Sequence, residues 1–428
     1  MNKGIIALFV VLALLVLVSP GLVGMLAEKS VDEQIEWAEL ENQDIVITAE
    51  RFDRGWFSSE GRHRIELKES NNALGANSLL VPFFGHTAPT LIVDTRLNHG
   101  PIALASIGDE KASLSPGLGE AVSTLSFESD NGVIVEVPGT IYSSIALNGD
   151  LTSNYSTVAG TGEIGTWGDV DITFESMVSS GLYSYGGHVE SVQLAEAAAE
   201  LSKLSFSGNV AMSKYDFAVG DISLTVDKLS LDTGGTEPFS IGPVVFETSS
   251  TVIDDKVHSA SKINMIAEDV PGLGRLGLDT RFTLRNIDAA ELNQFVASAR
   301  SAQANSTSYD IMSAIEKDVL ELLAAGADLH VEHLDIALPQ GTIKSEMNLR
   351  FLESDNSDLV WASLLLALEA DLKLEVPEII ANMAMVLSPQ AGMVESLLVK
   401  NGDVYELEAE YKKGLLTVNG VPMALPIQ

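Results

Sequence analysis

Strict alternation of apolar and polar residues recurs along this chain and limits its fold more than any other feature. It is clearest in residues 62–68, 275–285, 343–351, 366–376 and 405–411. A period of two places successive side chains on opposite faces of a strand. One apolar and one polar face are typical of antiparallel sheet, because parallel sheet is usually covered on both faces. We therefore predict one or more long antiparallel sheets, with Leu368 and Leu372 both on the apolar face.

Helical periodicity is scarce and falls mostly in the C-terminal half of the chain. Asp288 begins a sequence that resembles a capping box, and this predicts a helix over residues 289–301. Further helices are expected over residues 309–325 and 377–400, and a short one near 194–201. The predicted fold class is therefore α+β, mainly β, with a few amphipathic helices.

The N-terminus carries an apolar stretch over residues 4–27, whose 24 residues exceed the roughly 20 that cross a bilayer as a helix. Its densest part, Ile5–Val18, is also compatible with a cleaved signal peptide. An uncleaved signal anchor is the preferred interpretation, because no small-residue cleavage site follows Val18 and the apolar run resumes after Pro20. Lys3 lies before the span and acidic residues follow it, which places the body across the membrane in a single-pass topology.

Four segments follow from these patterns. Residues 1–27 form the signal anchor and residues 28–42 a stalk helix. Residues 43–235 form a β-rich region, and residues 236–428 form a second β-rich region that contains the helices. The boundary is drawn at the turn sequence Gly234-Gly235, although a continuous sheet could cross it.

Composition excludes several classes of function. The chain has 25 Lys and Arg residues against 60 Asp and Glu residues, a net charge of −35. A surface this acidic repels phosphate, so nucleic acid is not an expected partner. The absence of cysteine excludes disulfides, thiol nucleophiles and thiolate metal sites. The dispersed acidic residues are interpreted as a solvated surface.

Few motifs point to chemistry. His330 and His333 could form a metal pair, but their surroundings read as a strand with a slip that would separate them, and no third ligand is evident. Two G-x-G-x-x-G stretches, Gly160–Gly165 and Gly272–Gly277, run into predicted strands rather than helices, so they are interpreted as hairpin glycines. His99 precedes a Gly-Pro turn without an evident acid or nucleophile partner. We therefore predict no catalytic residues, no cofactor and no metal site.

Two segments suggest a family. The sequence from Phe52 to Ser59, FDRGWFSS, is followed about forty residues later by NHGPI from Asn98 to Ile102. Both, after an N-terminal anchor, resemble the YdgA-like family of bacterial envelope proteins of unknown function. Weaker similarity continues over residues 274–288 and 411–420. The chain departs from the family pattern at Asn98, where an acidic residue is expected, and at Ile102, where an aromatic residue is common.

The resemblance implies an inner-membrane anchor and a periplasmic body, and it implies no reaction. Within the first motif, Arg54, Trp56 and Phe57 are either a recognition loop or a strand and turn whose rings pack, and packing is favoured. The expected function is non-enzymatic, with a structural or interaction role in the envelope. The expected partners are the bilayer through residues 4–27, and an envelope protein or a second copy of the chain.

The alternative function is lipid binding or lipid transfer along an apolar sheet groove. A hydrolase with dispersed carboxylates is set aside, because no acid and base pair can be located. An apolar sheet face is either a packed core or a surface for acyl chains. Whether the few helices cover that face distinguishes the two functions.

Overall fold

The computed structural model describes residues 45–67, 90–99, 117–128, 132–162, 165–194, 199–215, 217–231, 239–270, 272–305, 308–354, 360–387 and 397–423. The anchor predicted over residues 4–27 and the stalk helix predicted over residues 28–42 lie outside these ranges. No helix within the ranges combines the length and the hydropathy that crossing a bilayer requires.

The chain divides into two compact units, Met1–Ser207 and Gly208–Gln428. The division falls within the strand β11 (Ala199–Met212). The domain boundary predicted at Gly234-Gly235 lies in residues outside the described ranges and stays a prediction. Because Leu194 lies in a strand and β11 begins at Ala199, the short helix expected near residues 194–201 is wrong at residue 194 and over residues 199–201.

The first unit is an antiparallel meander of strands. Pairing runs in the order β1, β2, β3, β4, β5, β6, β9 and β10, while β8 also pairs with β10 and β7 with β8. The strands are β1 (Ile45–Arg54), β2 (Ser58–Leu67), β3 (Thr90–His99), β4 (Gly117–Glu128), β5 (Ile134–Ala146), β6 (Leu151–Thr157), β7 (Gly160–Gly162), β8 (Gly165–Trp167), β9 (Val170–Met177) and β10 (Leu182–Leu194).

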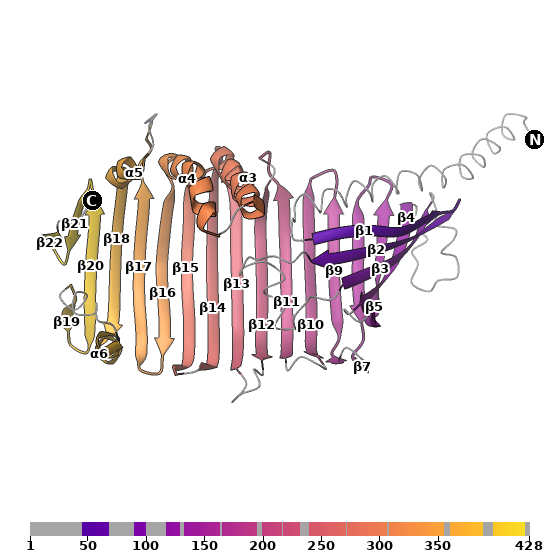
Figure 1. Ribbon diagram of the computed structural model, residues 1–428, viewed down its shortest axis with the longest axis horizontal. Helices are drawn as coiled ribbons and strands as arrows, with labels where there is room; N and C mark the ends of the chain where they lie inside the picture. The colour runs from indigo at the N-terminus through magenta and orange to yellow at the C-terminus, as the bar shows by residue number, and fades with distance from the viewer. Residues whose placement is uncertain are drawn as a thin grey trace, which may run out of the picture. The chain divides into compact units, whose positions relative to one another are not determined.

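Strands β12 to β17 of the second unit have 11 to 15 residues. The strands of this unit lie side by side in chain order except for β19 (Figure 1). Antiparallel pairing runs from β12 through β18 to β20, β21 and β22, and β19 pairs with β20. The strands are β12 (Ala218–Leu231), β13 (Phe239–Ile253), β14 (Lys256–Val270), β15 (Gly274–Asp288), β16 (Asp328–Leu338), β17 (Gly341–Phe351), β18 (Leu368–Pro377), β19 (Val399–Asn401), β20 (Val404–Lys412), β21 (Leu415–Val418) and β22 (Val421–Met423). Three of them, β13, β14 and β15, have 15 residues each, about three times the usual strand length.

The register of the second unit aligns apolar residues into rows on one face of its sheet. Leu372 of β18 lies opposite Met347 of β17, and Leu368 lies opposite Phe351, so both leucines share a face as predicted. One row runs through Leu224, Phe246, Ile263, Thr280, Leu334, Ser345, Leu374 and Leu407. A second runs through Ile222, Thr248, Ser261, Phe282, Val331, Met347, Leu372 and Ala409. We call the face that carries these two rows the apolar face.

Four helices lie among the described residues, all in the second unit: α3 (Ala289–Asn305), α4 (Ser308–Ala324), α5 (Trp361–Ala367) and α6 (Glu378–Leu387). Figure 1 shows α3, α4 and α5 at one end of the strands and α6 at the other. The predicted helices over residues 289–301 and 309–325 are confirmed. The region from residue 377 to 400 holds α6 and β19, and residues 388–396 between them lie outside the described ranges.

Helix α5 corrects the sequence analysis, which placed Leu366 in a strand. Leu366 lies in the helix and is exposed, and the strand begins only at Leu368. A local capping interaction starts the helix, because Ser363 Oγ donates to the carbonyl of Val360 at 2.7 Å and accepts from its amide at 3.2 Å. Leu364 then anchors the helix, since it is almost fully buried against Leu320 and Ala324.

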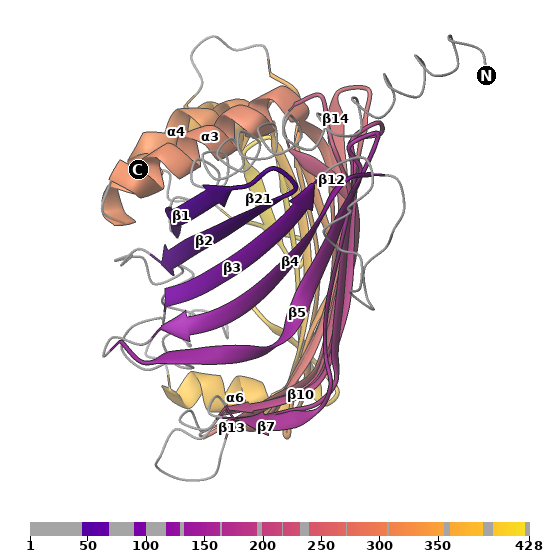
Figure 2. The same ribbon diagram turned by 90° about the vertical axis from the view of Figure 1, so that its right-hand side faces the viewer.

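The buried core of the second unit lies where the helices meet the sheet. Val257, Ile287, Ala289 and Ala327 form one buried cluster, and Leu320, Ala324 and Leu364 form another. Figure 2 shows α3 and α4 projecting to the same side of the strands at that end. We call the end of the sheet that holds these two clusters the covered end.

Candidate functional site

The apolar face away from the covered end keeps its large side chains partly exposed. Ile263, Phe282, Leu334, Met347 and Leu372 are all neither buried nor fully exposed. The residues of the two rows that are buried are the small polar ones, Ser261 and Thr280. In contrast, Ile287 and Val257 at the covered end are only 9% and 7% exposed. The middle of the sheet therefore presents apolar side chains that the described helices do not cover.

We call this middle part the bare span. It consists of the row residues Leu224, Phe246, Ile263, Phe282, Val331, Leu334, Met347, Leu372, Leu374 and Leu407. The two rows carry no charged residue, and their only polar groups are hydroxyls of serine and threonine. A surface of this composition suits hydrocarbon and offers no ligand set for an ion and no acid or base for a reaction.

The covered end is fixed by a polar cluster beside its core. Asp288 Oδ1 accepts hydrogen bonds from the amides of Ala290 and Glu291 at 3.0 and 3.2 Å, which caps α3. Lys256 Nζ donates to Asp288 Oδ2 at 3.2 Å and to the carbonyl of Ala325 at 3.3 Å. Lys256 therefore connects β14 to the start of α3 and to the end of α4.

Opposing influences act on the Asp288 carboxyl group. Partial burial raises its pKa, but the hydrogen bonds from the Glu291 amide and from Lys256 outweigh burial, so the pKa lies below its usual range. The neighbouring Glu291 behaves differently, because burial and the nearby carboxylate of Glu321 raise its pKa. The cluster is organised to hold a helix start, and Asp288 does this in its ionised form.

The first unit brings together the two motifs that suggested a family. The chain turns at Gly55, whose amide donates to the carbonyl of Ser58 at 2.7 Å, and Ser58 then lies opposite Asn98 of β3. A side chain at Gly55 would meet the Ser58 carbonyl oxygen at 2.6 Å, which explains the glycine. Phe57 is partly buried, as the packing interpretation requires, whereas Trp56 is 56% exposed. The side chains beyond Asn98 in the second motif lie outside what the structure describes.

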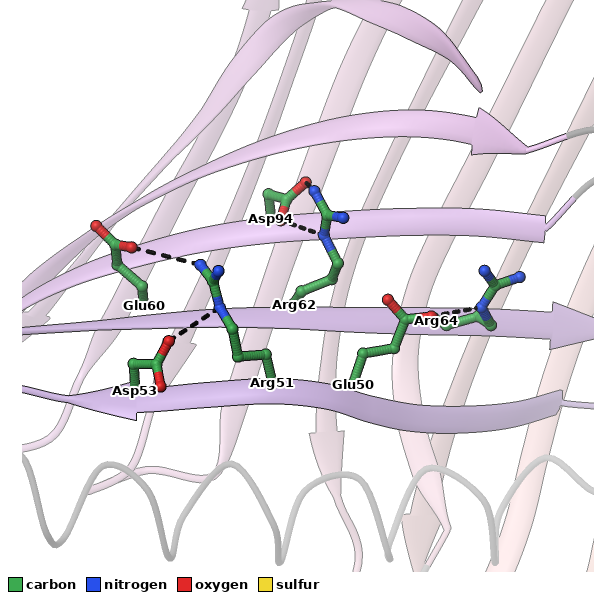
Figure 3. A network of polar contacts seen from close by, with 7 residues as sticks. All are labelled: Glu50, Arg51, Asp53, Glu60, Arg62, Arg64 and Asp94. Carbon is green, nitrogen blue, oxygen red and sulfur yellow. Dashed lines mark hydrogen bonds and ion pairs between the residues drawn. The ribbon is translucent and has the colours of Figure 1, made fainter. Parts of the chain in front are cut away.

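One face of β1, β2 and β3 carries a network of ion pairs (Figure 3). Arg62 binds Asp94 through two contacts of 2.7 and 2.8 Å, and Arg64 contacts Glu50 at 2.8 Å. Arg51 joins Asp53 at 3.0 Å and Glu60 at 3.4 Å. The alternation predicted for residues 62–68 is confirmed for the arginines, which share this polar face. Because the carboxylates match the guanidinium groups here, the network neutralises itself and is not a site for anions.

The histidine pair is held by separate partners. His330 contacts Asn348, and His333 Nε2 lies 3.3 Å from Asp279 Oδ1. The predicted slip is confirmed as a register shift between β15 and β16, yet both histidines lie opposite β15 residues of one face, Arg281 and Thr283. The slip therefore does not place them on opposite faces. Within the described residues, no three acidic or histidine side chains group as metal ligands would, and the prediction of no metal site stays a prediction.

The glycine motifs lie in hairpins, as predicted. Gly162 pairs with Gly165 between β7 and β8, and Gly274 pairs with Val270 between β14 and β15. Neither stretch leads into a helix, which a dinucleotide site would require. These pairings test only the two glycine motifs. The wider prediction of no cofactor stays a prediction.

Comparison with known proteins identifies one family. The model of a family described as a bacterial protein of unknown function (DUF945) matches residues 1–426. No curated protein matches the chain. No solved structure matches it either.

Proposed function

The chain belongs to the DUF945 family of bacterial proteins of unknown function, and we propose that it is a non-enzymatic envelope protein that binds the acyl chains of lipids along its bare span. The carrying observation is the partial exposure of the apolar rows between β12 and β20. Each CH₂ group of an acyl chain that leaves water for such a surface contributes about 0.8 kcal/mol. An extended hydrocarbon chain would therefore cover the apolar side chains that the described helices leave partly exposed.

The geometry favours this function over a purely structural role. A structural sheet gains most when its apolar face is sealed, as it is around Ile287 and Ala289. The large side chains near Met347 and Leu372 remain partly exposed instead. Adjacent apolar side chains that stay partly exposed from β12 to β20 suit a binding surface. The structural or interaction role remains the alternative if no lipid is bound.

We also propose the finer assignment to the YdgA-like group, with residues 4–27 as an uncleaved anchor and the body in the periplasm. The proposal is supported by the adjacent positions of Ser58 and Asn98, which join the two motifs, and by Lys3 before the apolar stretch. Protease added to intact spheroplasts should remove the body. Cleavage only after lysis would contradict the topology.

The lipid proposal is tested by native mass spectrometry of the full chain extracted in mild detergent. We expect phospholipid to remain bound to the parent protein. Leu372→Asp and Met347→Asp, which place a carboxylate in the bare span, should each abolish the bound lipid. The control variant Asp371→Ala changes the residue directly before Leu372, which lies on the exposed polar face of the same strand. This variant should retain the bound lipid.

Circular dichroism melting of the same proteins separates lipid loss from unfolding. Both aspartate variants should melt cooperatively near the parent temperature. Absence of phospholipid from the parent, or its retention in both folded aspartate variants, would overturn the proposal.

A further inference from the structure

A third row of side chains extends the apolar face on the side of the bare span that lies away from the covered end. Each of its residues lies two positions along its strand from a residue of the first row, which runs from Leu224 to Leu407, and so points to the same face. The strand register joins Val226, Val244, Met265, Leu278, Ile336 and Ile343, and it pairs Val376 with Tyr405. We call these residues of β12 to β18 and β20 the third row.

The third row is the most apolar of the three. Its members from β12 to β17 are all aliphatic or methionine, whereas the first row contains Thr280 and Ser345 and the second contains Thr248 and Ser261. The Thr248 and Ser261 hydroxyls bond each other at 2.9 Å, and Thr280 Oγ1 donates to the carbonyl of His333 at 3.0 Å. Every side chain of the third row is partly exposed. The row is therefore an uninterrupted strip of hydrocarbon across neighbouring strands.

Helix α6 borders the third row where β18 ends. Figure 2 shows α6 on the same side of the strands as α3 and α4. After Glu378 the helix contains no charged residue. Ala381 is buried, whereas Ile379 is 59% and Met383 is 45% exposed. No charged side chain of α6 beyond its first residue therefore limits the apolar surface at this end.

The sheet is wider than one acyl chain is long. The eight strands that carry the third row, spaced about 4.8 Å apart, span about 34 Å. An acyl chain in one leaflet of a bilayer spans roughly 15 Å, half of the hydrocarbon core. A pocket for a single lipid is bounded by the side chains that end it, but no charged residue divides the third row.

We propose that acyl chains lie along the third row, across the strands, and that the row holds more than one lipid molecule at a time without selecting an acyl-chain length. This inference rests on the proposed function and identifies the ligands as lipids of varied chain length. A second copy of the chain is a poorer occupant, because two bodies of net charge −35 repel each other, whereas hydrocarbon carries no charge.

The test counts bound lipids by native mass spectrometry of the full chain in mild detergent. The protein is saturated with dilauroyl or dioleoyl phosphatidylcholine, which differ in chain length and carry no net charge. Ile336→Asp interrupts the third row at β16 and should lose bound lipid. Ala337→Asp is the matched control, because it adds the same carboxylate at the next residue, which is exposed on the polar face opposite Gly277 and Thr342.

The difference in bound lipid between the two variants counts the lipids in the row and excludes lipid bound to residues 4–27. We expect a difference of more than one lipid per chain, and a larger difference for the shorter dilauroyl lipid, because more short chains fit along a row of fixed length. Circular dichroism melting should show that both variants unfold cooperatively near the parent temperature. Should Ile336→Asp unfold, the parent count must still be larger for the dilauroyl lipid.

Three results would overturn the inference. A count of one lipid, or equal counts for the two lipids, would indicate a pocket of fixed size and leave the proposed function standing. Equal lipid on the two folded variants would place the lipid away from the third row. A lipid-free dimer that Ile336→Asp dissociates would assign the row to a second copy. A parent protein that binds neither lipid would overturn the proposed function together with the inference.

Discussion

The covered end and the bare span of the second unit use the same strands but differ in what lies over them. At the covered end, Ile287 of β15 packs with Val257 of β14 beneath the first residue of α3. A few residues along the same two strands, Ile263 and Phe282 carry equally apolar side chains that remain partly exposed. The strand pattern therefore determines which face is apolar, and the placement of the helices determines where that face becomes a core.

The largest expected effect comes from a charge at the covered end. Ile287→Asp places a carboxylate among Val257, Ala289 and Ala327, where burial of an unpaired charge costs about 4 kcal/mol or more. We expect the variant to lose the cooperative thermal transition of the second unit. A melting temperature within a few degrees of the parent would show that this end is not a sealed core.

A charge in the bare span should cost far less. In Leu372→Asp the carboxylate remains in contact with water, so we expect destabilisation of about 1 kcal/mol, within the range of partly exposed sites. Denaturant titration of the two aspartate variants side by side measures the difference. Equal destabilisation would remove the distinction between the two regions.

Loss of the helix cap at the covered end should destabilise the protein by an amount similar to that of the charge in the bare span. Asp288→Ala removes the acceptor for the amides of Ala290 and Glu291, which typically costs about 1 kcal/mol. The folded-state pKa of Asp288 is lowered, so its contribution is present above the unfolded pKa and is lost as the pH falls through the folded value.

The stability difference between the parent and Asp288→Ala should therefore be constant near neutral pH and shrink below about pH 4. Chemical unfolding at several pH values measures it. A difference that grows on acidification would contradict the role assigned to the ionised carboxylate.

The smallest effect is expected on the polar face of the first unit. Arg62 and Asp94 are bonded through two contacts but are both partly exposed, so their coupling should be below about 1 kcal/mol. A double-mutant cycle with Arg62→Gln and Asp94→Asn, at low and high salt, should give a coupling that decreases with salt. A large, salt-independent coupling would mean that this face is covered.

Sequence reasoning succeeded where a local period carries the information. The alternation in residues 343–351 and 366–376 correctly placed Met347, Leu368 and Leu372 on one face. The capping-box sequence that begins at Asp288 also predicted the start of α3, because the Asp288 side chain caps this helix. Leu366 was wrongly placed in the strand, because the spacing of apolar residues at every second position extends back to Leu366, which lies in α5. The formation of α5 depends on the contact of Leu364 with α4.

The partial exposure of the bare span could not be predicted from the sequence, and the reason is physical. The side chains of Ile287 and Leu372 have the same polarity, and alternation reports only which way each points. Their different exposure arises because α3 follows Ile287 directly in the chain, whereas no described helix lies over Leu372. The sequence analysis accordingly left both a core and a lipid surface open.

The most direct test of acyl-chain binding is photo-crosslinking from the two faces of one strand. A benzoylphenylalanine side chain is introduced in place of Leu372 or of its neighbour Lys373, which is exposed on the polar face. After irradiation of living cells, mass spectrometry identifies adducts on the purified full chain. We expect phospholipid adducts at position 372 and none at position 373. Equal adducts at both positions, or none at position 372, would contradict the proposal that the bare span binds lipid.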